Sequence, residues 1–132
     1  MMQHSCTICL GSNTPDQEEQ IKKAIEHLKE QLSEVEVSAT YRSAAYNGKD
    51  APYLNAVVHG YTDRSIEQME TDLKLWEKKQ GRTAEMRSEG KVPIDLDLVI
   101  WCGRIMRQVD FERHYFNEGY RELLARGVFE MM

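Results

Sequence analysis

The sequence Ile94-Asp95-Leu96-Asp97-Leu98-Val99-Ile100-Trp101 decides the fold and points to a site. Successive side chains of a β-strand point to opposite faces, so this alternation predicts a strand with one apolar face, made of Ile94, Leu96, Leu98 and Ile100. Asp95 and Asp97 then share the other face, about 6.6 Å apart, and are followed there by Val99 and Trp101. Aspartate is depleted in strands and neighbouring carboxylates repel, so the pair predicts a cation site, with a solvated polar face as the alternative.

The chain before this strand switches between strand and helix periodicity. Strands are predicted over Ser5–Leu10, Val35–Tyr41 and Tyr53–Thr62, where apolar and β-branched residues run together or alternate. Helices are predicted to begin at Thr14 and at Ser65, because each residue precedes a glutamine by three positions, as in a capping box. The apolar stripes of the two helices are Ile21, Ala24, Ile25, Leu28 and Leu32, and Ile66, Met69, Leu73 and Trp76.

The order of these elements predicts an α+β fold. Strand, helix, strand, strand, helix, strand is the βαββαβ order of a ferredoxin-like sandwich, in which an antiparallel sheet carries its helices on one face. The other face would then be free for a site. Residues 1–132 show no linker or repeat and are predicted to form a single domain.

Three further segments complete the predicted secondary structure. Gly81–Pro93 has no apolar period, so we expect a mobile loop between the second helix, which should end near Gly81, and the last long strand. Cys102-Gly103 is typical of a turn, and it predicts a short partner strand around Ile105. A last helix is predicted over Asn117–Arg126.

Composition excludes several classes of protein. The 132 residues are 41% hydrophobic and 30% charged, a balance that favours a folded globule over a disordered chain. The net charge of −5 argues against a nucleic-acid partner, which needs a cationic surface. No apolar run approaches the length of about 18 residues that spans a bilayer, and no signal-peptide pattern follows Met1, so we expect no membrane partner and a cytoplasmic location.

The three cysteines are expected to be free thiols. Their odd number suits a reducing compartment. Cys6 and Cys9 have the C-x-x-C spacing of some metal sites, but residues three apart in a strand point to opposite faces. We therefore interpret them as small apolar core residues.

Other candidate site residues lie near the aspartates in the predicted sheet. Arg82, Arg87 and Lys91 are cations in the preceding loop, and they suit phosphate binding, although a charged loop is also commonly just solvated. Tyr53 and Asn55 share one strand face, where an aromatic ring and an amide can recognise a planar heterocycle or simply pack across strands. The carboxylate pair suits Mg2+, which often takes one or two carboxylates and completes its shell with water and phosphate.

Taken together, these residues resemble the 6-hydroxymethyl-7,8-dihydropterin pyrophosphokinase family. The resemblance spans roughly residues 8 to 120, with order and spacing both in agreement. Members of that family are ferredoxin-like, and they move the β,γ-pyrophosphate of ATP onto the hydroxymethyl oxygen of the pterin and release AMP. The matching motifs are Leu10-Gly11-Ser12-Asn13, Tyr41-Arg42-Ser43, Tyr53-Leu54-Asn55-Ala56, Glu77 with Gln80-Gly81-Arg82, Asp95-Leu96-Asp97 and His114-Tyr115.

The resemblance implies a role for each matched position. Asp95 and Asp97 would hold two Mg2+ ions, and Asp97 would also help to activate the pterin hydroxyl group. Arg82 and Lys91 would act with Asp97 in catalysis, on the phosphates of the co-substrate ATP. The implied ATP-binding residues are Glu77, Leu98, His114 and Tyr115, and the implied pterin-binding residues are Ser43, Ala44, Tyr46, Tyr53, Asn55 and Tyr120.

Two alternatives remain open from the sequence. Glu89 stands where the family usually carries a tryptophan, and Ala84 and Val92 stand where it carries arginines. These differences are compatible with a paralogue that binds nucleotide or pterin without turnover, or that uses another acceptor. The second alternative is a ferredoxin-like interaction module that pairs with another chain through its exposed sheet face.

Overall fold

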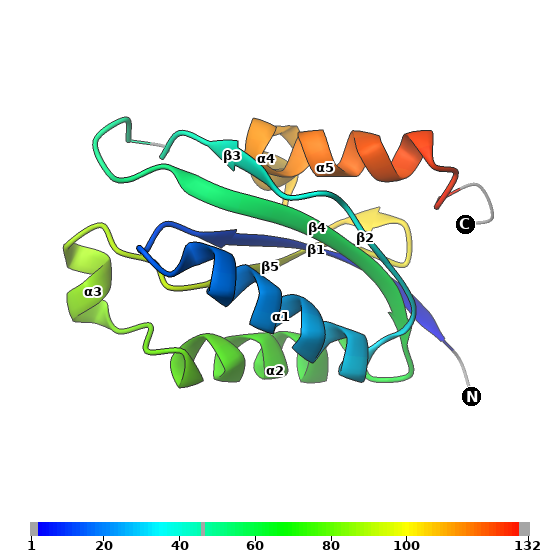
Figure 1. Cartoon of the computed structure of the whole chain (residues 1–132). Coiled ribbons are helices and arrows are strands. Elements are labelled where there is room, and N and C mark those ends of the chain that lie inside the picture. Colours follow the sequence, from blue (N-terminus) through cyan, green and yellow to red (C-terminus); the bar gives the residue numbers. More distant parts are fainter. Residues whose placement is uncertain (1–2, 46, 130–132) are drawn as a thin grey trace.

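The computed structural model describes residues 3–45 and 47–129, and it has three layers (Figure 1). Within those residues, six strands form one antiparallel sheet in the order β2-β4-β1-β5-β6, and β3 also pairs with β4. No helix in these two ranges is long and apolar enough to cross a bilayer. The elements are β1 (His4–Ser12), α1 (Gln17–Gln31), β2 (Ser33–Val37), β3 (Tyr41–Ser43), β4 (Tyr53–Thr62), α2 (Ile66–Lys79), α3 (Ala84–Ser88), β5 (Asp95–Trp101), β6 (Arg104–Ile105), α4 (Gln108–Glu112) and α5 (His114–Ala125).

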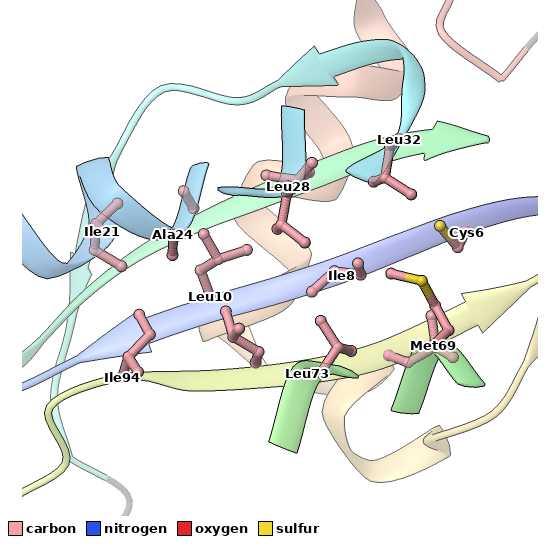
Figure 2. Packing of buried hydrophobic residues seen from close by; sticks show 14 of the residues in the cluster. Cys6, Ile8, Leu10, Ile21, Ala24, Leu28, Leu32, Met69, Leu73 and Ile94 are labelled. Carbon is pink, nitrogen blue, oxygen red and sulfur yellow. The ribbon is translucent and has the colours of Figure 1, made fainter. Parts of the chain in front are cut away.

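The main core lies between the sheet and the helix pair α1 and α2. Figure 2 shows side chains of β1, the central strand, meeting side chains from both helices. Each fully buried leucine or isoleucine here contributes on the order of 1.5–3 kcal/mol of transfer free energy. The predicted α+β, ferredoxin-like order is confirmed, with both of its helices on one face. The labelled members of this cluster are Cys6, Ile8, Leu10, Ile21, Ala24, Leu28, Leu32, Met69, Leu73 and Ile94.

A second core cluster lies on the opposite face of the sheet, under α4 and α5 (Figure 1). Its fully buried anchors on α5 are Phe116 and Leu123, which pack against Cys9 and Val57. This face is therefore free over only part of its length, which corrects the expectation of an open face. The last helix begins at His114, three residues before the predicted start.

A β-bulge in β5 changes the predicted faces of its last residues. Thr7 pairs with Ile100 and Ile8 with Leu98, so Val99 is the extra residue of the bulge. After it, Ile100 packs in the cluster under α5 and Trp101 packs against the cluster under α1 and α2, the reverse of the prediction. The aspartates precede the bulge and keep their predicted face.

Two strands replace the single strand predicted over Val35–Tyr41. The pairing of β3 with β4 is shifted by one residue relative to that of β2. Ser38 lies at this shift, where its Oγ accepts a hydrogen bond from the backbone N–H of Val57 at 2.9 Å. As a result Tyr41 turns toward α5 and donates to the carbonyl oxygen of Tyr115 at 2.6 Å. In one regular strand over Val35–Tyr41, the two-residue period would instead have placed Tyr41 on the face of Val35 and Val37.

The two predicted capping boxes have different outcomes. Ser65 and Gln68 form a complete capping box at the start of α2, as predicted. At the start of α1 the prediction is wrong by two residues, because Asp16 is the N-cap and Thr14 donates its hydroxyl to Asp16 at 2.6 Å. The amide of Gln17 instead donates to the carbonyl oxygen of Ser12 at 2.9 Å, so the turn between β1 and α1 is held by side chains.

The short elements around β5 were only partly predicted. The segment 81–93 contains α3, which is capped by the Thr83 hydroxyl accepting from the N–H of Met86 at 3.1 Å. The partner strand around Ile105 is confirmed as β6, whereas α4 was not predicted. Helices of five residues are too short to show an apolar period. Cys6 and Cys9 lie in different core clusters as free thiols, as predicted.

Replacing Gly119 by alanine is expected to lower the free energy of unfolding by about 1–3 kcal/mol. A Cβ at this position of α5 would lie 2.6 Å from Val57 Cγ2 and 2.9 Å from Tyr41 Cε1, so the helix lies against the sheet only because the residue is glycine. The clash should outweigh the gain in helix propensity, which is at most about 1 kcal/mol. Urea denaturation measures the difference. Arg121→Ala, on the exposed side of the same helix, is the control and should stay within about 0.5 kcal/mol.

Candidate active site

A cleft of about 630 Å³ opens where the last residues of β1 meet the first residues of β4 and β5. It lies beyond the part of the sheet that α5 covers, and it extends round the edge of β5 to α2. Gly11 of β1 pairs with Asn55 on one side and with Asp95 on the other, so residues distant in sequence meet at its floor. Several ionisable groups line this cleft, among them Glu77, Arg82, Asp95 and Asp97.

The carboxylates of Asp95 and Asp97 form the centre of the cleft. Asp97 pairs with Cys9 across the sheet and its side chain is 20% exposed, whereas that of Asp95 is 34% exposed. Burial, followed by the negative charge of Asp95 and a hydrogen bond to it, raises the pKa of Asp97 to about 8. Without a bound cation, the pair therefore tends to retain a proton at neutral pH.

Arg82 binds the first carboxylate of the pair. Its Nη1 lies 2.7 Å from Asp95 Oδ1 and 3.0 Å from Glu77 Oε2. Burial works against the charge of Arg82, but the two carboxylates outweigh it and the pKa of the guanidinium is raised. Glu77 also accepts a hydrogen bond from the backbone N–H of Leu96 at 2.8 Å, so α2 is tied to β5, and burial raises the pKa of the Glu77 carboxyl.

Arg107 and Asp110 are site residues that the sequence reasoning missed. Arg107 Nη2 lies 3.8 Å from Asp97 Oδ1, and its Nε donates to the carboxylate of Asp110. The buried Asp110 also accepts a hydrogen bond from the hydroxyl of Tyr115. The only signal in the sequence is an oppositely charged pair three positions apart, on a helix too short to be predicted.

The other wall of the cleft carries the aromatic and amide candidates. Tyr53 lies so close to β1 that a Cβ on Gly11 would be 3.3 Å from its Cδ2, so glycine allows the ring to approach. The amide nitrogen of Asn55 donates to Ser43 Oγ at 2.8 Å and to the carbonyl oxygen of Tyr41 at 3.2 Å. Burial, and next the charge of Asp95, raise the pKa of the Tyr53 hydroxyl.

The cleft brings together most of the site residues that were predicted from the sequence. They come from β3, β4, α2, β5 and α5, and from the segments that join them. Arg87, one of the three loop cations, also lines the cleft. The predicted residues in its wall are Ser43, Ala44, Tyr53, Asn55, Glu77, Arg82, Asp95, Asp97, Leu98 and Tyr115.

Three predicted residues that the structure describes do not line the cleft. Lys91 is exposed, with its Nζ 3.5 Å from Glu89 Oε1, and His114 is exposed beside Glu118 at 3.3 Å. Tyr120 packs in the second core cluster, stacked on Phe116 and in contact with Phe111 and Phe129, so its ring is not presented to the cleft. Tyr46 lies outside the described residues.

The donor set fits Mg2+. Within residues 3–45 and 47–129, no group of three or more histidine, cysteine, aspartate or glutamate side chains is arranged to hold a metal. The two half-buried carboxylates of Asp95 and Asp97 remain, and they supply only hard oxygen ligands. Mg2+ commonly binds one or two protein carboxylates and takes its other ligands from water and phosphate. Asp95 and Asp97 could therefore hold it together with a phosphate-bearing ligand.

Comparisons with known proteins agree with this geometry. A model of the 7,8-dihydro-6-hydroxymethylpterin-pyrophosphokinase family matches residues 7–123. The chain is 31% identical over 99 residues to the 2-amino-4-hydroxy-6-hydroxymethyldihydropteridine pyrophosphokinase of Aquifex aeolicus, a match that covers 74% of this chain and 61% of that protein. It is 32% identical over 102 residues to the folate synthesis bifunctional protein of Chlamydia trachomatis, covering 71% of this chain and 22% of that protein.

In the absence of metal, the contribution of Asp97 to stability is expected to fall as the pH rises from about 4 to about 8. An unfolded aspartate has a pKa of about 3.9, whereas that of Asp97 is raised to about 8 in the folded state. Across this window the Asp97 carboxyl binds fewer protons in the unfolded chain than in the folded chain, so its contribution to the free energy of unfolding decreases. Asp97→Asn removes this contribution, and near pH 8 it should be more stable than the wild type by on the order of 1 kcal/mol or more.

Urea denaturation in the presence of a chelator, at several pH values, measures this difference. Burial also raises the pKa of Glu77, which acts with the same sign, so some pH dependence should remain in the variant. Asp63→Asn, an exposed aspartate after β4, is the control and should follow the wild-type curve. Parallel curves for Asp97→Asn and the wild type would contradict the assignment.

Proposed function

The chain belongs to the 7,8-dihydro-6-hydroxymethylpterin-pyrophosphokinase family, and from this we propose that it transfers pyrophosphate from ATP to 6-hydroxymethyl-7,8-dihydropterin and releases AMP. The chain spans 61% and 22% of the two relatives, so the activity of those whole proteins is part of the proposal. The observation that carries it is the carboxylate pair Asp95 and Asp97, placed between cations on one wall and an aromatic ring and amide on the other. A cytoplasmic location, as expected from the sequence, suits a co-substrate such as ATP.

The proposed reaction needs a group that takes a proton from the pterin hydroxymethyl group. The hydroxymethyl oxygen forms a bond to the β-phosphorus of ATP, and the bond from that phosphorus to the bridging oxygen of AMP breaks, leaving its electron pair on AMP. Asp97 is the proposed proton acceptor and, with Asp95, would hold two Mg2+ ions. When bound, the ions would neutralise phosphate charge and make the hydroxyl more acidic.

Cations and nucleotide contacts are proposed on the β5 and α2 side of the cleft. Nη1 of Arg82 contacts both Asp95 and Glu77. The planar guanidinium group has further N–H donors, which can bind phosphate oxygens. Glu77, Leu98 and Tyr115 also line the cleft and are the proposed ATP contacts. His114 and Lys91 retain their predicted roles only as proposals. Each would need to turn toward the ligand from its present place beside a glutamate.

The pterin is proposed to bind against β3 and β4. Tyr53 offers the face of its ring, and Ser43 and Ala44 line the same wall. Asn55 uses its amide nitrogen within the protein, but the described residues show no hydrogen bond to its Oδ1. That oxygen lies near Gly11 at the floor of the cleft, where it can accept from the N–H groups of a planar heterocycle. Tyr46 and Tyr120 also keep their predicted pterin roles only as proposals.

Purified protein is expected to form AMP from ATP only when both Mg2+ and 6-hydroxymethyl-7,8-dihydropterin are present. Asp97→Ala should lower the rate at least about 100-fold, because it removes both a metal ligand and the proton acceptor. Chromatography of the nucleotides measures the rate, and Asp63→Ala is the control that should keep it. If the wild-type protein formed no AMP but still bound the nucleotide, the binding-only alternative would replace this proposal.

Arg82→Lys is expected to reduce kcat about tenfold or more, with a smaller change in KM for ATP. Lysine keeps the charge, but its single ammonium group cannot contact Asp95 and Glu77 and also donate the paired hydrogen bonds that a guanidinium group makes to a phosphate. Steady-state kinetics at saturating pterin separates the two constants. Arg121→Lys on the exposed face of α5 is the matched control. A wild-type kcat in Arg82→Lys would remove the arginine from the proposed chemistry.

A further inference from the structure

Asn13, in the turn after β1, bonds to two segments that flank the cleft on opposite sides. We infer that it is a positioning residue that couples the two walls: the stretch 50–52 before β4 and the stretch 82–92 before β5. The inference rests on the proposed function for the identity of the ligands, because it expects ATP and the pterin to bind against different walls.

The contacts of Asn13 with the stretch 82–92 use both its backbone and its side chain. Its backbone N–H donates to the carbonyl oxygen of Val92 at 3.0 Å, and its side-chain Oδ1 accepts from the N–H of Val92 at 2.6 Å. Its Nδ2 donates to the carbonyl oxygen of Gly90 at 2.8 Å. Because the residue is buried, these bonds are shielded from competing water.

The same amide nitrogen reaches the other wall. Asn13 Nδ2 donates to the carbonyl oxygen of Ala51 at 3.4 Å, so one side-chain group joins both stretches. The stretches also touch directly, since a Cβ on Gly90 would lie 2.1 Å from Asp50 Oδ1. Gly90 has a φ of +74°, a conformation that glycine adopts without strain. A displacement of either stretch therefore disturbs the other through Asn13 and through Gly90.

Each stretch presents residues to the cleft, although Asn13 itself does not line it. Asp50 and the adjoining Tyr53 belong to the wall proposed for the pterin, and Arg82 and Arg87 belong to the wall proposed for the phosphates. A ligand that orders one wall should therefore lower the free-energy cost of ordering the other wall, and so strengthen the binding of the second ligand. Such coupling is reciprocal between the two ligands, and a factor of at least about 5 is typical.

The first experiment measures that factor by calorimetry with Mg2+ and a nonhydrolysable ATP analogue, with and without saturating pterin. We expect wild-type affinity for the analogue to rise at least about fivefold when the pterin is present. In Asn13→Ala the factor should fall below about 2. The matched control is Gln20→Ala, which removes another buried amide near the same turn, and it should keep the wild-type factor. Among the described residues, the side chain of Gln20 bonds only to Asp16.

The second experiment uses no ligand. Hydrogen–deuterium exchange at the amides of 50–51 and 82–92 is expected to rise together in Asn13→Ala, by about tenfold, and to stay unchanged in Gln20→Ala. Asn13→Asp keeps an oxygen that can accept from the N–H of Val92 but loses the donor to Gly90 and Ala51. It should therefore protect the Val92 amide while releasing the stretch 50–52.

The outcomes separate this inference from the proposed function. A wild-type protein that bound neither ligand would contradict the proposed function, and the exchange experiment would still decide whether Asn13 holds the two stretches together. Unchanged exchange in Asn13→Ala would overturn the inference. So would a coupling factor near 1 in a wild-type protein that binds both ligands, or an equal loss of coupling in Gln20→Ala, which would indicate a general loss of stability.

Discussion

The electrostatic repulsion between Asp95 and Asp97 is the constraint around which the rest of the cleft is organised. The two carboxylates are held on one face of a strand, partly out of water, where each disfavours the charge of the other. Arg82 lies against the first and Arg107 near the second, so the ligand-free protein partly offsets the repulsion with its own cations. A divalent cation would complete this compensation, so under the proposed function the pair anchors a triphosphate through the metal and does not serve to stabilise the fold.

The fold produces the cleft by covering only part of one sheet face. Val57 lies under α5, and Cys9 lies at the boundary, because it belongs to the second core cluster and also lines the cleft. Gly11 and Asn55, two residues further along their strands and away from α5, lie in the cleft. The helix approaches so closely because Gly119 has no side chain. The same helix begins at His114, so Tyr115 can contribute both to the second core cluster and to the edge of the cleft.

Local sequence patterns predicted the long elements and much of the site, and they failed where short elements or irregular pairing intervened. The capping box at Ser65 and the two faces of β4 depend on spacing within a few residues. Arg82 was expected near the aspartates because it lies in the segment that precedes their strand. Local patterns failed at Val99. It is the extra residue of a β-bulge, so the residues that follow it point to the opposite faces from those predicted. Tyr120 was expected at the pterin, yet its ring stacks on Phe116, because α5 presents that side to the sheet.

Within an uninterrupted strand or helix, the sequence by itself determined which residues share a face, since that depends only on the two-residue period of a strand and the 3.6-residue period of a helix. It therefore placed Asp95 beside Asp97 and Tyr53 beside Asn55. Only the tertiary structure decided which residues that are far apart in the sequence come into contact. Asn13 and Val92 are 79 positions apart, and Arg107 reaches Asp97 from the N-cap position of the short helix α4. Such neighbours depend on strand register and helix docking, which arise from the packing of the whole core and leave no periodic signal in the residues themselves.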